Sequence, residues 1–135
     1  MPAGVELVRE IIAALNSGDV DGMLERMHPD FEWTPLEASP VSTVYRGHDQ
    51  VRSYVEDWLF TFEGLRIELE DPTALADRVL VMVRGQGRGR VSRVQLYNRF
   101  CQVWTVRDGT AIAMHEYASR DEGLARLRSQ VDELS

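Results

Sequence analysis

The stretch from Tyr97 to Tyr117 constrains the fold most, because it has the pattern of two long antiparallel strands joined at Arg107-Asp108-Gly109. An Asp-Gly pair between β-rich runs is a strong short-range hairpin signal, and the loop length decides which side chains share a face. A two-residue loop would leave both faces of the hairpin mixed. A three-residue loop, with Gly109 as a left-handed bulge, opposes Val106 to Thr110 and produces one apolar face. We therefore predict the three-residue loop.

In this register the apolar residues of the hairpin gather on one face, as Phe100, Trp104, Val106, Ile112 and Met114. Three polar residues, Asn98, Gln102 and Glu116, share that face. A polar group within an apolar surface is costly unless it is hydrogen-bonded. These three residues are therefore the first candidates for function.

The chain has 135 residues, and we expect residues 1–135 to form a single domain with a substantial core. The formal net charge of -7 disfavours nucleic acid and anionic membranes as main partners. We see neither a signal peptide nor an apolar run long enough to cross a bilayer. The single cysteine, Cys101, excludes an intrachain disulfide, so a reducing, cytoplasmic location is expected.

The periodicity of apolar residues predicts four helices and five strands. The helices are expected over 5–15, 19–27, 47–63 and 121–134, with Gly64 ending the third, and the strands over 30–35, 65–70, 78–87, 92–107 and 110–119. This order predicts an α+β, cone-shaped fold in which the N-terminal helices pack on a strongly curved, mixed or antiparallel sheet and enclose a pocket. The loop from Leu36 to Arg46, with Pro40, is expected at its rim.

Three segments carry a resemblance to a known family: ALNSGDVDGMLERMHPDFEW (14–33), YRGHDQVRSYVEDWLFTF (45–62) and VWTVRDGTAIAMHEY (103–117). With their spacing, they resemble the SnoaL-like group of the nuclear-transport-factor-2-like superfamily, which includes ketosteroid isomerase and polyketide cyclases. The resemblance implies a cone-shaped fold, commonly a homodimer, with a small-molecule pocket between helices and sheet. It does not specify a reaction, because this scaffold hosts many chemistries and also proteins without catalysis.

The resemblance also implies a role for one carboxylate. In the polyketide cyclases, a carboxylate seven residues past the turn glycine acts as the acid/base, and here that position is Glu116. A second polar residue, often an aspartate, stands seven before the glycine, where this chain has Gln102. Glutamine donates and accepts hydrogen bonds but cannot exchange a proton near neutral pH, so the chain departs from a two-carboxylate pattern.

Each polar candidate has two interpretations. Glu116 is a general acid or base whose pKa is raised in an apolar pocket, or a strand-end carboxylate paired with Arg120 or with an arginine of the neighbouring strand. Gln102 and Asn98 orient a substrate carbonyl or stabilise an oxyanion, or they satisfy one another within the sheet.

The aromatic residues also have two interpretations, as the lining of the pocket or as simple core. We predict that the substrate is contacted by Trp33, Tyr54, Trp58, Phe62, Phe100, Trp104 and Met114. Tyr54 and Trp58 are the preferred pair, one turn apart on the helix that faces the pocket. A buried Tyr54 hydroxyl needs a partner, which a ligand oxygen would provide.

The three histidines, His28, His48 and His115, lack the spacing of metal ligands, so we expect neither a metal nor a cofactor. With no histidine at useful spacing, Cys101 is not expected to be a nucleophile. The convex face of the sheet should carry His115, Tyr97, Arg99, Cys101 and Tyr117, a mixed surface that is a candidate homodimer interface.

Two functions follow from the sequence. The first is a cofactor-independent acid/base enzyme, of isomerase, cyclase, dehydratase or hydrolase type, in which Glu116 acts on a small hydrophobic substrate. The second is a protein of the same fold that binds a small molecule, or serves as a dimeric scaffold, without catalysis.

Overall fold

A computed structural model describes residues 3–36 and 43–134. Its helices are α1 (Ala3–Asn16), α2 (Val20–Glu25), α3 (Gly47–Thr61) and α4 (Arg120–Leu134). Its strands are β1 (Met27–Thr34), β2 (Tyr45–Arg46), β3 (Phe62–Leu75), β4 (Arg78–Gly89), β5 (Gln95–Arg107) and β6 (Thr110–Tyr117). Residues 37–42, which include Pro40 of the predicted pocket rim, lie outside the described residues.

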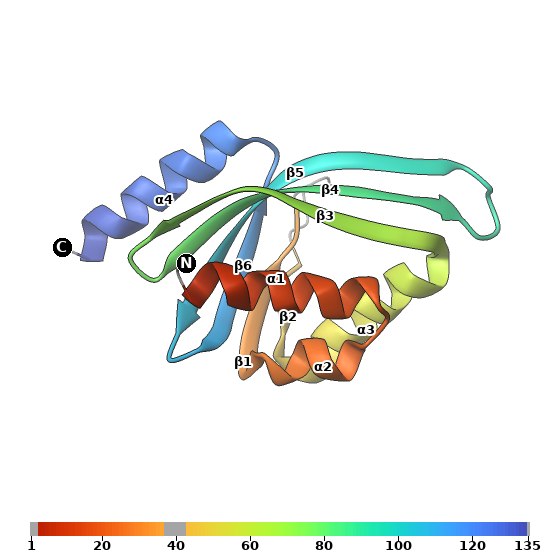
Figure 1. The fold of residues 1–135 in the computed structure, drawn as a ribbon, viewed down its shortest axis with the longest axis horizontal. Helices are drawn as coiled ribbons and strands as arrows, with labels where there is room; N and C mark the ends of the chain where they lie inside the picture. The colour runs from red at the N-terminus through yellow and green to blue at the C-terminus, as the bar shows by residue number, and fades with distance from the viewer. Residues whose placement is uncertain (1–2, 37–42, 135) are drawn as a thin grey trace.

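The strands form one sheet in the order β2-β1-β6-β5-β4-β3. Its pairs are antiparallel except for β1 and β6, which run parallel, so the sheet is mixed. Figure 1 shows the sheet strongly curved, with α1, α2 and α3 within its concave side and α4 on the opposite side. The predicted α+β fold with helices on a curved sheet is confirmed, and the position of α4 behind the sheet adds to it.

The helix boundaries follow local signals, with one exception. Asp19 caps α2 as predicted, since its carboxylate accepts a hydrogen bond from the backbone nitrogen of Gly22 at 2.9 Å. Gly64 does not end α3, contrary to the prediction. The helix stops at Thr61, and the extended backbone of Phe62 leads directly into β3, so Gly64 lies within a strand.

The hairpin between β5 and β6 corrects the predicted loop. Arg107 pairs with Thr110, so the loop has two residues, Asp108 and Gly109, both with positive φ (53° and 72°). Such a turn matches the right-handed twist of the strands. The bulge lies beyond the loop, at Ile112, which is the extra residue of β6. Ile112 was predicted on the apolar face, and its place in the bulge corrects that prediction.

This bulge determines which residues of β5 and β6 lie opposite one another at the site. Beyond it, Trp104 lies opposite Met114, and Gln102 lies opposite Glu116. Directly opposed residues of neighbouring strands point to the same face. Gln102 and Glu116 are therefore neighbours on the concave side, below which the main core packs.

A second, smaller core lies between the convex side of the sheet and α4, and it removes part of the convex face from the predicted dimer interface. Cys101 and Tyr117 are buried there, packed with Leu127 of α4. Burial raises the pKa of the Cys101 thiol to about 11, which disfavours a thiolate nucleophile. On the outer part of this face, Tyr97 is 65% exposed, and Arg99 is also exposed. None of the described helices is long and apolar enough to cross a membrane.

Candidate functional site

A cavity of about 290 Å³ lies between the helices and the concave side of the sheet. Its walls come from elements far apart in the chain: Ile11 and Leu15 of α1, Tyr54 of α3, Leu65 of β3 and Glu116 of β6. Most of the lining is aliphatic or aromatic. Concave apolar sites with a few placed polar groups are typical of small-molecule binding.

Glu116 is the acidic residue among the described residues that line this cavity, and its side chain is held at both oxygens. The Gln102 amide nitrogen donates to Oε2 at 3.0 Å, and the backbone nitrogen of Leu36 donates to Oε1 at 3.0 Å. Glu116 is only 8% exposed. Its carboxylate forms no ion pair with any arginine that the structure describes.

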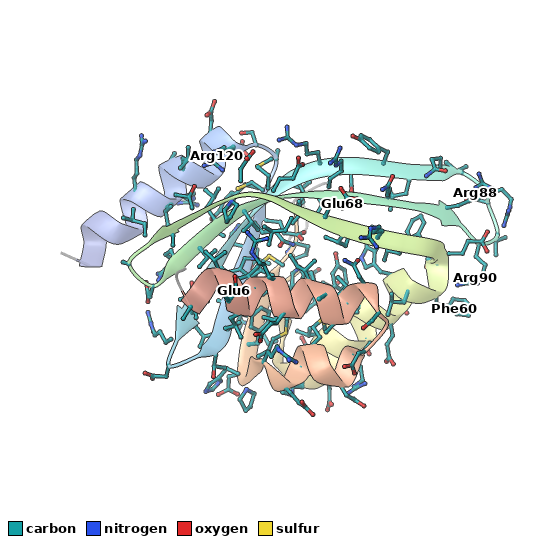
Figure 2. The ribbon with its side chains drawn as sticks, in the orientation of Figure 1. Glu6, Phe60, Glu68, Arg88, Arg90 and Arg120 are labelled. Carbon is teal, nitrogen blue, oxygen red and sulfur yellow. The ribbon has the colours of Figure 1, made fainter. Side chains whose placement is uncertain are left out.

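The predicted alternative, a salt bridge from Glu116 to Arg120, is wrong. The Arg120 guanidinium donates instead to the Asp71 carbonyl oxygen at 3.0 Å and to the Thr73 hydroxyl at 2.7 Å. Figure 2 shows Arg120 on the side of the sheet where α4 packs, away from α1. Glu116 is thus a buried carboxyl without a cationic partner among the residues that the structure describes.

Burial raises the pKa of Glu116 above its ordinary value. The hydrogen bonds from Gln102 and Leu36 act in the opposite direction, because they favour the charged carboxylate, but burial is the larger effect. A carboxyl with a raised pKa holds and releases its proton closer to neutrality, which is the requirement for proton transfer.

Trp104 determines how the Gln102 amide is oriented. The Trp104 indole nitrogen can only donate, and it does so to the Gln102 side-chain oxygen at 3.0 Å. The Gln102 nitrogen must therefore point the other way, toward Glu116. Gln102 and Asn98 do not satisfy one another, contrary to one of the two interpretations drawn from the sequence.

Two further polar groups lie beside Glu116. The Trp33 indole nitrogen is buried and has no hydrogen-bond partner among the described residues, although it is close enough to Glu116 to favour the charged carboxylate. The Tyr54 ring packs edge-on against Trp33, with centroids 5.3 Å apart. Burial, and to a lesser degree Glu116, raises the pKa of Tyr54 to about 12, so its hydroxyl is neutral.

The family model of the SnoaL-like domain matches residues 8–115. The chain belongs to this family. No curated protein matches it.

Solved structures agree with the SnoaL-like fold. An NTF2-like protein of unknown function from Burkholderia pseudomallei K96243 is 20% identical, with a TM-score of 0.76 over 93% of this chain and 97% of that one. TerC, co-crystallized with polyporic acid, is 21% identical, with a TM-score of 0.74 over 91% and 96%. A putative SnoaL-like polyketide cyclase from Jannaschia sp. CCS1 is 21% identical, with a TM-score of 0.73 over 84% and 83%. At these identities the likeness shows the fold alone.

The structure of this SnoaL-like chain places most of the predicted site residues on one cavity. Those that line it are Trp33, Tyr54, Trp58, Asn98, Phe100, Gln102, Trp104 and Glu116. Two predicted contacts do not line it. Met114 is 1% exposed and belongs to the core. Phe62, the residue directly after α3, stacks on Trp58 with ring centroids 5.1 Å apart.

The sequence interpretation missed the part of the lining that comes from α1 and from the outer strands. Ile11, Ile12 and Leu15 lie within the helix predicted over 5–15, but they were not predicted to line the cavity. Leu65 and Leu96 have no sequence signal, because they line the cavity only through the curvature of the sheet.

The histidines of the SnoaL-like domain lie apart. His28 accepts a hydrogen bond from the Asp30 backbone nitrogen, and the His48 ring contacts the Met27 carbonyl oxygen at 2.9 Å. His115 stacks on Tyr117. Within the described residues, no three His, Cys, Asp or Glu side chains are grouped so that they could hold a metal ion.

Proposed function

We propose that this SnoaL-like domain, with residues 1–135 as one functional unit, is a cofactor-independent acid/base enzyme of isomerase, cyclase, dehydratase or hydrolase type. Its substrate is a small hydrophobic molecule, and Glu116 is the residue that takes up and returns a proton. The observation that carries the proposal is a buried carboxyl on the wall of an apolar cavity, with no cationic partner in the described part of the chain. Burial raises its pKa toward the range that proton transfer needs.

The neighbours of Glu116 support a division of roles. As a base, Glu116 would remove a proton from a carbon next to a substrate carbonyl, and charge would develop on the carbonyl oxygen. The Trp33 N–H, which has no acceptor among the described residues, is available to donate to that oxygen. Gln102 would hold the Glu116 carboxylate in position, and Tyr54 and Asn98 would contact the substrate.

The relatives support a small-molecule pocket. TerC was crystallised with polyporic acid, and the Jannaschia relative and another from Xanthomonas campestris are named putative polyketide cyclases. These names describe those proteins. They make a hydrophobic substrate the natural first test for this one.

A second candidate is a protein that binds a small molecule, or forms a dimeric scaffold, without catalysis. It is favoured by Gln102, because the site then has a single carboxylate where the polyketide cyclase pattern often has two. A homodimer would use the open part of the convex face around Tyr97 and Arg99, since α4 covers Cys101 and Tyr117.

The test is hydrogen–deuterium exchange of 2-tetralone, a two-ring ketone, followed by NMR in D2O. We expect the wild type to accelerate exchange next to the carbonyl and Glu116→Gln to lower the rate by about 100-fold or more. Glu25→Gln, which changes an exposed carboxylate on α2, is the matched control. Equal rates in Glu116→Gln and wild type, with 2-tetralone bound by both in tryptophan fluorescence titrations, would leave the non-catalytic binder as the function.

A further inference from the structure

The cavity has a second polar group far from Glu116, the Asn98 side chain. Every second residue of β5 from Asn98 to Gln102 lines the cavity, namely Asn98, Phe100 and Gln102. The Gln102 amide is engaged by Trp104 and Glu116, whereas the half-buried Asn98 amide makes no hydrogen bond to a described residue. Its donor and acceptor are both free to bind a ligand.

Gly85 makes room for this amide. Gly85 lies directly opposite Asn98 in the β4–β5 ladder and lines the same cavity. A Cβ atom at position 85 would lie 2.6 Å from the Asn98 side-chain oxygen and 3.3 Å from Ile67 Cδ1. The absence of a side chain at Gly85 therefore permits the observed position of the Asn98 amide.

The two polar ends of the cavity are separated by about the length of a small two-ring molecule. Asn98 and Gln102 are four residues apart on one strand, which corresponds to about 13 Å between their Cα atoms. The cavity of about 290 Å³ is roughly twice the ~150 Å³ of an engineered cavity that binds benzene. A ligand of two rings therefore fits the space between the two ends.

The charge of the cavity restricts the ligand further. None of the described residues that line it is a lysine or an arginine. A carboxylate or phosphate on the ligand would be buried without a counter-charge, beside Glu116, at a high cost. The polar groups of the ligand are therefore neutral ones, such as hydroxyl or carbonyl oxygens.

We propose that the cavity selects a neutral, two-ring ligand with an oxygen at each end, one bound beside Glu116 and Trp33 and the other by the Asn98 amide. This inference rests on the proposed ligand-binding function and names its substrate class. Asn98 is then a residue that determines specificity, and Gly85 is a positioning residue that acts through it.

The experiment compares two probes that differ by one hydroxyl group. Biphenyl-4-ol carries an oxygen at one end, and 4,4′-dihydroxybiphenyl carries one at both ends. Their dissociation constants are measured by tryptophan fluorescence titration for the wild type, Asn98→Leu, Gly85→Ala and the control Tyr97→Phe. Leucine keeps the size of asparagine and removes its hydrogen bonds, and Tyr97 is exposed, outside the cavity lining.

We expect the wild type and Tyr97→Phe to bind 4,4′-dihydroxybiphenyl about fivefold tighter than biphenyl-4-ol, the gain of one hydrogen bond. Asn98→Leu and Gly85→Ala should lose this preference, so that the ratio of their dissociation constants for the two probes falls to about one. Equal binding of both probes by the wild type, or a preference that persists in Asn98→Leu, overturns the second subsite alone. If the wild type binds neither probe, the ligand-binding function is overturned together with it.

Discussion

The Trp104 indole nitrogen donates to Gln102 rather than to the Glu116 carboxylate, yet Trp104 sets the environment of Glu116 through that one side chain. Trp104 donates to the oxygen of Gln102, which leaves the nitrogen of Gln102 to donate to Glu116. The indole cannot accept, so this order cannot reverse while Trp104 is in place. The chain of three side chains therefore favours the ionised form of Glu116, against the effect of burial.

The first prediction concerns this chain of hydrogen bonds. Replacing Gln102 by leucine removes a donor that stabilises the charged carboxylate, so the pKa of Glu116 should rise further above its ordinary value. Trp104→Phe should shift the pKa in the same direction by less, because Gln102 remains but its amide can turn. The measurement is a pH titration of the Glu116 side-chain carboxyl carbon by NMR.

The control for this titration is Gln95→Leu, on the same strand but exposed and outside the cavity lining. It should leave the Glu116 titration where the wild type has it. A Gln102→Leu protein with an unchanged Glu116 titration would show that the hydrogen bond does not influence the carboxyl.

The second prediction concerns stability against pH. Burial raises the pKa of Glu116 in the folded state above its value in the unfolded chain. At a pH between these two values, Glu116 is ionised in the unfolded chain and protonated in the folded protein. The wild type therefore loses stability as pH rises through this window, beginning at about pH 4. Glu116→Gln lacks this loss, and its stability relative to the wild type should increase from pH 4 to pH 8.

Urea denaturation at several pH values measures this difference. Glu25→Gln, an exposed carboxylate, should follow the wild type across the same range. A stability difference between Glu116→Gln and wild type that stays flat with pH would mean that the carboxyl titrates alike in the folded and unfolded states.

The position of Glu116 shows how much of the site the sequence could predict. The predicted pairing of Val106 with Thr110 was wrong, but the true register beyond the bulge differs from it by two residues. Side chains of a strand alternate with a period of two, so a shift of two leaves each on its predicted face. Asn98, Gln102 and Glu116 were therefore placed on the correct face although the loop was wrong.

The contacts of that site could not be predicted in the same way. Gln102 reaches Glu116 only because the bulge at Ile112 brings them opposite, and a bulge depends on the twist of the whole sheet. The bond from the Leu36 nitrogen spans 80 positions in the chain, and no local pattern encodes it. The same holds for α4, because its residues predict a helix but do not predict on which face of the sheet that helix packs.

The third prediction concerns the attachment of α1 to the edge of the sheet. β3 is an edge strand, and the Asn16 amide takes the place of a neighbouring strand, accepting from the Ile67 nitrogen at 2.7 Å and donating to its carbonyl oxygen at 2.8 Å. Asn16→Ala leaves both Ile67 groups unpaired and should destabilise the fold by about 1–3 kcal/mol.

Urea denaturation checks this value, with Ser17→Ala as the control. The Ser17 hydroxyl bonds only the Ala14 carbonyl oxygen within the same chain segment, so its loss should cost less than about 1 kcal/mol. Similar losses in the two variants would contradict a special role of Asn16 at the edge of β3. Because Ile67 also lines the cavity, Asn16→Ala should weaken binding of biphenyl-4-ol as well.

The last prediction concerns the contact of α4 with the sheet. A Cβ atom at Gly123 would lie 2.4 Å from Cys101 Sγ and 3.2 Å from Leu80 Cδ1. On helix propensity alone, Gly123→Ala should stabilise α4 by about 1 kcal/mol. Because the added methyl group meets a buried sulfur, we expect the opposite sign, a loss of about 1–3 kcal/mol.

A double-mutant cycle with Cys101→Ala isolates this contact. Removing the sulfur leaves Cys101 Cβ 3.6 Å from the new methyl group, an ordinary van der Waals distance, so the double variant should be more stable than the sum of the single effects by about 1–2 kcal/mol. Additive free energies of unfolding would show that the added methyl group does not press on Cys101 Sγ, and would contradict close packing of α4 on the sheet at Gly123.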